Sequence, residues 1–180
     1  MPRLKSVIPN EATGKAKELL EGIQKKLGVT PNLMRTLANS PAALHGYLSF
    51  GEALAGGTLG GKLREQIALA VAEANQCQYC LSAHSAIGKR VGLDAAQIEA
   101  SRRGRSADPK AEAALLFARR VLETRGQVSD ADLEAVRTAG FGDGEIAEII
   151  ANVALNILTN YFNLVAQTEI DFPKVALAAA

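Results

Sequence analysis

Apolar residues recur at intervals of three and four along most of the chain, and strict alternation of apolar and polar residues is hard to find. This spacing places apolar side chains on one face of an α-helix, whereas alternation would indicate strands. The pattern therefore predicts an all-α protein, a single-domain helical bundle. The helices are predicted at about residues 11–27, 31–39, 42–55, 63–74, 76–90, 95–102, 110–124, 133–139 and 144–168.

Capping residues punctuate this pattern. Residues suited to the N-cap precede several predicted helices, namely Ser40, Asp94, Asp108 and Ser129, the last with Asp132 in capping-box spacing. The longest irregular stretch is 56–61, with four glycines in six residues, and it cannot hold a helix because each glycine costs about 1 kcal/mol relative to alanine. We expect a joint there between two helical parts of one domain.

Length and charge restrict the class of protein. A chain of 180 residues that is 48% hydrophobic can form one domain with a real core, which we assign to residues 1–180. The net charge of +1 predicts no nucleic-acid partner and no membrane surface, and the arginines at 102, 103 and 105 are interpreted as a solvated loop. With two cysteines and no N-terminal apolar leader, we expect a cytoplasmic protein whose thiols rest in the reduced form.

Both cysteines and one of the two histidines fall within eight residues, as Cys77, Cys80 and His84. At offsets of 0, 3 and 7 they share one stripe of a helix, so all three side chains can meet one pocket. A disulfide across so short a loop removes little entropy from the unfolded chain, so a structural staple explains the pair poorly. Redox or metal chemistry explains it better.

The turn before the cysteines favours a reactive thiol. Asn75 with Gln78 reads as an N-cap and its capping-box partner, which would place Cys77 in the first turn of a helix. Unpaired N–H groups and the helix dipole stabilise a thiolate at that position. If helices 63–74 and 76–90 form a hairpin, Glu65 faces His84 and can orient its imidazole, which accepts the thiol proton. An ordinary surface carboxylate is the equally weighted alternative for Glu65.

Zinc is the competing interpretation of this cluster. Cys77, Cys80 and His84 supply three ligands, but a structural zinc site needs a fourth, and the other histidine, His45, is far away in sequence. We therefore predict no metal, and interpret His45 as an ordinary core or surface residue.

A polar stripe crosses the last predicted helix. Its members, at spacings of four, four and three, are Asn152, Asn156, Asn160 and Asn163. They line a pocket, form a seam between subunits, or bond to other helices of the same chain. Because the helix is apolar nearly all round, we favour the subunit seam.

The array of Glu65, eleven residues, then Cys77-x-x-Cys80-x-x-x-His84 resembles the alkylhydroperoxidase D (AhpD)-like branch of the carboxymuconolactone decarboxylase family. The strings at 64–75, 160–163 and 171–173 are similar to the same family and its peroxidase-related members. The motif is tight over about 64–91, and the helical layout is compatible over most of the chain. The decarboxylase branch lacks the Cys-x-x-Cys pair, which argues against lactone decarboxylation.

The resemblance implies a cysteine-based hydroperoxide reductase that forms a homotrimer or homohexamer and needs no cofactor. In that family pattern Cys80 attacks the peroxide, Cys77 resolves the product into a disulfide, and Glu65 with His84 relays the proton. A dithiol electron donor, a lipoyl group or a small redox protein, recharges the pair.

One departure keeps other functions open. The family archetype has histidine just before the second cysteine, whereas this chain has Tyr79, a poor base at neutral pH because its ordinary pKa is about 10. A dithiol–disulfide oxidoreductase or redox-sensing oligomer without peroxide turnover is the alternative. A helical oligomerisation module with incidental cysteines is a third possibility, which the Glu65, Cys77, Cys80 and His84 spacing disfavours.

Overall fold

A computed structural model describes residues 1–178, in which all regular secondary structure is helical and no strand is present. The all-α prediction is confirmed, while the predicted domain of residues 1–180 ends two residues beyond the described part. A short 3-10 turn, η1 (Pro9–Glu11), precedes the α-helices. These are α1 (Gly14–Leu27), α2 (Asn32–Leu37), α3 (Pro41–Ala55), α4 (Gly61–Ala74), α5 (Gln78–Arg90), α6 (Ala95–Arg102), α7 (Pro109–Glu123), α8 (Asp130–Thr138) and α9 (Asp143–Ala166).

Helix α4 is the centre of the fold. Its residues 66–73 are all buried, since it packs against α5, α6, α7 and α9. The sequence there is almost entirely apolar, and burial of Ile67, Leu69 and Val71 contributes about 1.5–3 kcal/mol for each side chain. A helix buried on every side holds its few polar residues in fixed positions.

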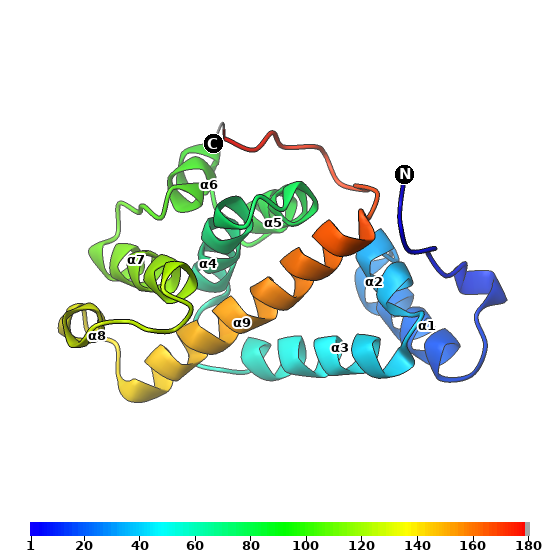
Figure 1. The fold of residues 1–180 in the computed structure, drawn as a ribbon, viewed down its shortest axis with the longest axis horizontal. Helices are drawn as coiled ribbons and strands as arrows, with labels where there is room; N and C mark the ends of the chain where they lie inside the picture. Colours follow the sequence, from blue (N-terminus) through cyan, green and yellow to red (C-terminus); the bar gives the residue numbers. More distant parts are fainter. Residues whose placement is uncertain (179–180) are drawn as a thin grey trace.

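Helix α9 crosses the molecule diagonally, with α3 on one side and α4 and α5 on the other (Figure 1). It has the length and apolar composition of a membrane-spanning helix. However, it carries a row of buried asparagines against its neighbours, which is the arrangement of a core helix rather than a lipid-facing one.

The predicted helix starts are confirmed at Ser40, Asp94, Asp108 and Ser129, whose side chains all accept N–H groups of the following turn. The glycine-rich joint is a fixed loop before α4. The Glu148 carboxylate accepts the N–H groups of Thr58 and Leu59, each at 2.9 Å. A Cβ at Gly57 would lie 2.6 Å from the same carboxylate, so any larger residue there would displace Glu148 from these N–H groups.

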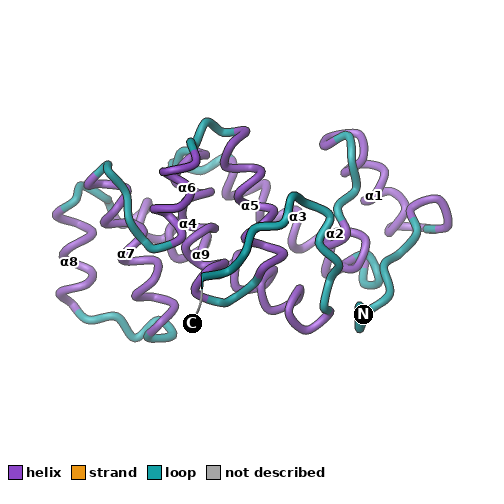
Figure 2. The backbone as a smooth tube through the Cα atoms, turned by 90° about the horizontal axis from the view of Figure 1, so that it is seen from above, coloured by secondary structure: helices purple, strands orange, loops and turns teal. Residues whose placement is uncertain are grey.

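The hydrophobic core divides into two clusters. One joins α1, α2 and α3 to α5 and to one face of α4, and the other joins the opposite face of α4 to α7, α8 and α9. In Figure 2 the helices α7 and α8 lie at one end of the molecule, and α1 and α2 lie at the other. Both cysteines belong to the first cluster.

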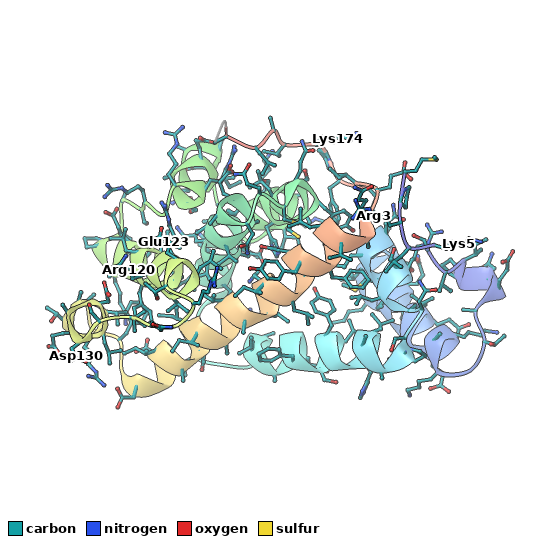
Figure 3. The ribbon with its side chains drawn as sticks, viewed as in Figure 1. Arg3, Lys5, Arg120, Glu123, Asp130 and Lys174 are labelled. Carbon is teal, nitrogen blue, oxygen red and sulfur yellow. The ribbon has the colours of Figure 1, made fainter. Side chains whose placement is uncertain are left out.

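A C-terminal tail, residues 167–178, returns from the end of α9 across α5 towards α6 (Figure 1). The Val175 N–H donates to Ser82 Oγ at 3.1 Å, and Gln78 Nε2 donates to the Val175 carbonyl at 3.1 Å. Lys174 lies on this tail at the upper edge of the molecule (Figure 3).

Arg102 corrects the prediction of a solvated basic loop. It ends α6 and is mostly buried, with Nε bonded to Glu73 at 2.6 Å and Nη2 bonded to the Ala176 carbonyl of the tail at 2.8 Å. The other two arginines do lie at the surface, where they pair with glutamates. Of the three arginines, Arg102 therefore holds the C-terminal tail, and the other two form a charged surface.

Candidate active site

The dithiol lies where the chain turns from α4 into α5. Asn75 ends α4, Gln76 takes a left-handed backbone with φ of 55°, and Cys77 is the N-cap of α5. The prediction of Asn75 as the N-cap is wrong, because its amide donates instead to Asn160 Oδ1 on α9, at 2.9 Å. That partner is 85 residues away and has no signature in the local sequence.

The two cysteines sit at the cap and in the first turn of α5. The Sγ atom of Cys77 accepts the N–H of Cys80 at 3.3 Å, and both residues are free thiols. Only 1% of Cys77 and 2% of Cys80 is exposed. Because the first N–H groups of a helix and its dipole favour negative charge, this position stabilises a thiolate.

Cys80 is the more acidic thiol. The side chain of Cys77 donates to its sulfur and lowers the pKa of Cys80 to about 7, with help from Asn163 and His84 and against the cost of burial. The same hydrogen bond, together with burial, raises the pKa of Cys77 far above its ordinary range. Above about pH 7, therefore, Cys80 carries the negative charge while Cys77 keeps its proton.

Glu65 and His84 are in direct contact across the α4–α5 hairpin, as the hairpin geometry predicts. The distance between His84 Nδ1 and Glu65 Oε2 is 2.8 Å, and the two side chains are 21% and 18% exposed. Burial disfavours the imidazolium, but the charge and hydrogen bond of Glu65 outweigh it and raise the pKa of His84. Since Glu65 holds Nδ1, Nε2 is the nitrogen left for proton exchange.

The asparagine stripe of α9 is buried inside one chain, so the favoured interpretation as a subunit seam is wrong. Asn152 and Asn156 donate back to carbonyls of their own helix, at 2.8 Å each. Asn163 Nδ2 donates to Cys80 Sγ at 3.3 Å, and Asn160, fully buried beside it, also lowers the pKa of Cys80. The C-terminal part of the stripe is thus a donor surface for the thiolate.

Tyr79, between the two cysteines, is buried. Its hydroxyl accepts the N–H of Leu33 at the start of α2, at 3.0 Å, and its ring meets Phe172 of the tail edge to face, with centroids 5.8 Å apart. Burial is the main reason that the pKa of Tyr79 rises well above its usual range. The residue that replaces the archetypal histidine therefore joins α2, α5 and the tail, and its hydroxyl keeps its proton near neutral pH.

An apolar cavity of about 150 Å³ opens onto Cys80 and His84 but not onto Cys77. We call it the inner pocket. Tyr47 of α3 lines it and was missed in the sequence, where nothing in the spacing relates it to the cysteines. Burial, with the nearby charges of Cys80 and Glu65, raises the pKa of Tyr47 to about 12, so it stays protonated.

The described residues hold no cluster of three metal-binding side chains of the His, Cys, Asp and Glu types. His45 lies on the surface of α3, where Nε2 is 3.5 Å from Ser49 Oγ. His84 is held by a carboxylate. The site therefore contains an acidic thiol and a second thiol, with an imidazole close to both the acidic thiol and a carboxylate.

Comparison with known proteins gives a consistent result. Residues 41–124 match the carboxymuconolactone decarboxylase family, and a search of curated proteins found no match. The chain is similar to a peroxidase-related protein from Ralstonia eutropha JMP134, described as an alkylhydroperoxidase AhpD core, with TM-score 0.83 and 29% identity over 94% of this chain and 92% of that one.

Other solved structures agree in fold. A peroxidase-related protein from Silicibacter sp. TM1040 has TM-score 0.80 and 24% identity over 98% of this chain and 96% of that one. The debrominase Bmp8 has TM-score 0.79 and 19% identity over 94% and 92%. At these identities the likeness concerns the fold alone.

Proposed function

We propose that this chain is a thiol-dependent peroxidase. Residues 41–124 match the carboxymuconolactone decarboxylase family, and the chain has the AhpD-like fold predicted from its sequence. Its substrate is an organic hydroperoxide, which it reduces to the alcohol. The observation that carries the proposal is that the acidic thiol, Cys80, is the one that faces the inner pocket, beside a histidine held by a carboxylate.

The first step is attack of the Cys80 thiolate on the terminal oxygen of the hydroperoxide. An S–O bond forms, the O–O bond breaks, and the alkoxide leaves. His84, kept protonated by Glu65, gives its proton to the alkoxide, which departs as the alcohol. Cys80 is left as a sulfenic acid, so the sulfur has been oxidised by two electrons.

The second step forms the disulfide. The Cys77 sulfur attacks Cys80 Sγ, and the thiol proton that its raised pKa retains leaves with the hydroxide as water. A dithiol donor, a lipoyl group or a small redox protein, then reduces the disulfide, becomes a disulfide itself, and returns one proton to His84. The cycle consumes one hydroperoxide and one dithiol and yields one alcohol and one water.

The description of the Ralstonia protein as peroxidase-related supports this proposal. The alternative is a dithiol–disulfide oxidoreductase or redox-sensing oligomer without peroxide turnover. The engagement of Tyr79 with Leu33 favours that alternative to the extent that peroxide reduction needs the base found in the archetype.

We place this enzyme in the cytoplasm, as a homotrimer or homohexamer assembled through the outer face of α9. Large apolar side chains are exposed along that face, namely Ile150, Leu158, Tyr161, Leu164 and Val165. Light scattering tests the assembly, and a species of single-chain mass at micromolar concentration would refute it.

The deciding experiment is thiol titration. The reduced protein is mixed with one equivalent of cumene hydroperoxide, and free thiols and alcohol are counted. We expect two thiols lost and one alcohol formed per chain. If a small disulfide oxidised the two thiols and the hydroperoxide did not, the oxidoreductase alternative would be established instead.

A further inference from the structure

An apolar groove lies next to the inner pocket. It runs between α1 and α3 and has a volume of about 420 Å³. Its walls are formed by Leu19, Gly22 and Ile23 of α1 and by Leu48, Gly51 and Ala55 of α3. We call it the α1–α3 groove.

The groove and the inner pocket share three lining residues, Leu27, Met34 and Tyr47. A molecule whose reactive end lies against Cys80 therefore has an apolar surface on which to continue past these side chains. The inner pocket alone, at about 150 Å³, is smaller than the roughly 300–1,000 Å³ of ordinary ligand sites. It holds a hydroperoxide group and a few carbons, and the rest of a larger substrate must lie elsewhere.

Glycines in both helices keep the groove open. A Cβ on Gly22 would meet nothing within 4 Å, and one on Gly51 would only touch Leu155 Cδ2 at 3.9 Å. Neither glycine has a positive φ, so neither is needed for a turn. Glycine inside a helix is destabilising by about 1 kcal/mol relative to alanine, so the two glycines keep this space open at the expense of helix stability.

The groove has the length of an alkyl chain and no site for a charge. Along α1 it extends from Glu18 to Leu27, about 14 Å at the rise of an α-helix. Its rim carries Glu18, Lys26 and Glu52, and Lys26 already pairs with Glu52 at 3.7 Å. An uncharged apolar chain fits this surface better than a carboxylate.

We propose that the α1–α3 groove binds the hydrocarbon tail of the substrate, and that the substrate class is long-chain alkyl hydroperoxides. This inference rests on the proposed function, since it places the hydroperoxide group of the same molecule at Cys80. The tail lies between α1 and α3, and the hydroperoxide group passes Tyr47 to reach the sulfur.

The test is a series of primary alkyl hydroperoxides from ethyl to decyl. Each buried methylene is worth about two- to fourfold, so kcat/KM should rise by about 100-fold or more across the series. The variant Gly22→Leu fills the groove without touching Cys80, His84 or Glu65. We expect it to lower kcat/KM for the decyl substrate by about tenfold or more and to leave the ethyl substrate unchanged.

Gly46→Leu is the matched control. Gly46 is on α3, exposed, with open space around a Cβ and outside both lining sets, so the same substitution should leave the whole series unchanged. If kcat/KM of the parent did not change with chain length, or if Gly22→Leu and Gly46→Leu had equal effects, the proposed role of the groove would be refuted.

Binding of 1-decanol by calorimetry separates this inference from the proposed function. We expect binding to the parent and to Gly46→Leu, and at least about tenfold weaker binding to Gly22→Leu. Decanol binding of this pattern without any peroxide turnover would refute the peroxidase but keep the groove. Turnover of ethyl hydroperoxide without decanol binding would refute the groove but keep the peroxidase.

Discussion

In α6 the N-cap Asp94 accepts the N–H of Gln97 at 2.8 Å, and the Gln97 side chain accepts the N–H of Asp94 in return at 3.0 Å. In α5 the corresponding positions are Cys77 and Cys80, joined by a single N–H to sulfur bond of 3.3 Å. Sulfur is a weak acceptor, so α5 has the weaker cap.

The two helix starts therefore put the same backbone geometry to different uses. The first N–H groups of α6 are satisfied by a carboxylate, whereas in α5 the N–H of Cys80 is satisfied by the Cys77 sulfur, and the hydrogen bond between the two thiol side chains separates their pKa values. Asp94 is exposed and closes a local turn, whereas Cys80 also needs Asn163 and His84 from elsewhere in the fold. The first arrangement stabilises a helix, and the second lowers the pKa of one thiol.

The largest expected effect comes from the sulfurs. Cys80→Ser should lower the rate of peroxide reduction by at least about 10³-fold, because it removes the attacking atom. Cys77→Ser should still reduce about one equivalent of peroxide and then stop, because no disulfide forms. Single-turnover alcohol yield measures both, and similar residual rates in the two variants would contradict the assignment of roles.

The proton relay comes next. Glu65→Gln and His84→Gln should each reduce the rate by about 10²–10⁴-fold, the usual range for general acid–base groups. Because the two residues act as a unit, the double variant should be little worse than the poorer single one. Glu134→Gln, on the exposed side of α8, is the control. Multiplicative losses, in variants with intact circular dichroism, would mean independent roles.

The pH dependence is a smaller effect of the same site. Alkylation of the parent by iodoacetamide should rise through an inflection near pH 7, where Cys80 ionises. Cys77→Ala removes the main donor and should move the inflection upward, whereas Cys77→Ser keeps a hydroxyl donor and should move it less. An unchanged inflection in Cys77→Ala would show that Asn163 and His84 suffice.

The same ionisation affects stability. Since the pKa of Cys80 is lowered on folding, the folded chain binds fewer protons than the unfolded chain between about pH 7 and the ordinary value of 9.0. The free energy of unfolding contributed by Cys80 is thus complete above pH 9, and is lost as pH falls through about 7. Urea denaturation of the parent and of Cys80→Ala across this window measures it, and parallel curves would contradict it.

The smallest effect is expected at the other helix start. Asp94→Ala should lower the free energy of unfolding by about 1 kcal/mol and leave peroxide reduction unchanged. Urea denaturation measures the loss, and the rate assay is its control. A change in the alkylation inflection of Cys80 would show that the two helix starts are coupled.

Local signals predicted most of the fold. Ser40, Asp94, Asp108 and Ser129 were found because a capping side chain bonds within its own turn. The boundaries of α5 and the roles of Asn75 and Asn163 depend on bonds across 83 or 85 residues, and no local pattern specifies them.

The candidate site divides in the same way. The spacing of Cys77, Cys80 and His84 predicted that they share one site, and the expected helical hairpin predicted that Glu65 joins them. Their catalytic roles stay predictions. Tyr47 reaches the pocket only through the packing of α3, so its sequence context gave no sign of it. For Tyr79 the residue type already predicted a poor base, but its bond to Leu33 on α2 has no signature in the local sequence.

The C-terminal tail is synthesised long after the two cysteines that it packs against. Val175 bonds to Ser82, and Ala178 bonds to Glu73 at 2.7 Å, from 93 and 105 residues away. A ribosome adds about 5–20 residues per second, so Cys80 is made on the order of 5–20 s before Val175. During that interval the nascent chain carries its two thiols without the segment that packs over α5 in the folded protein, so we expect the thiols to be oxidised more readily before synthesis is complete than after it.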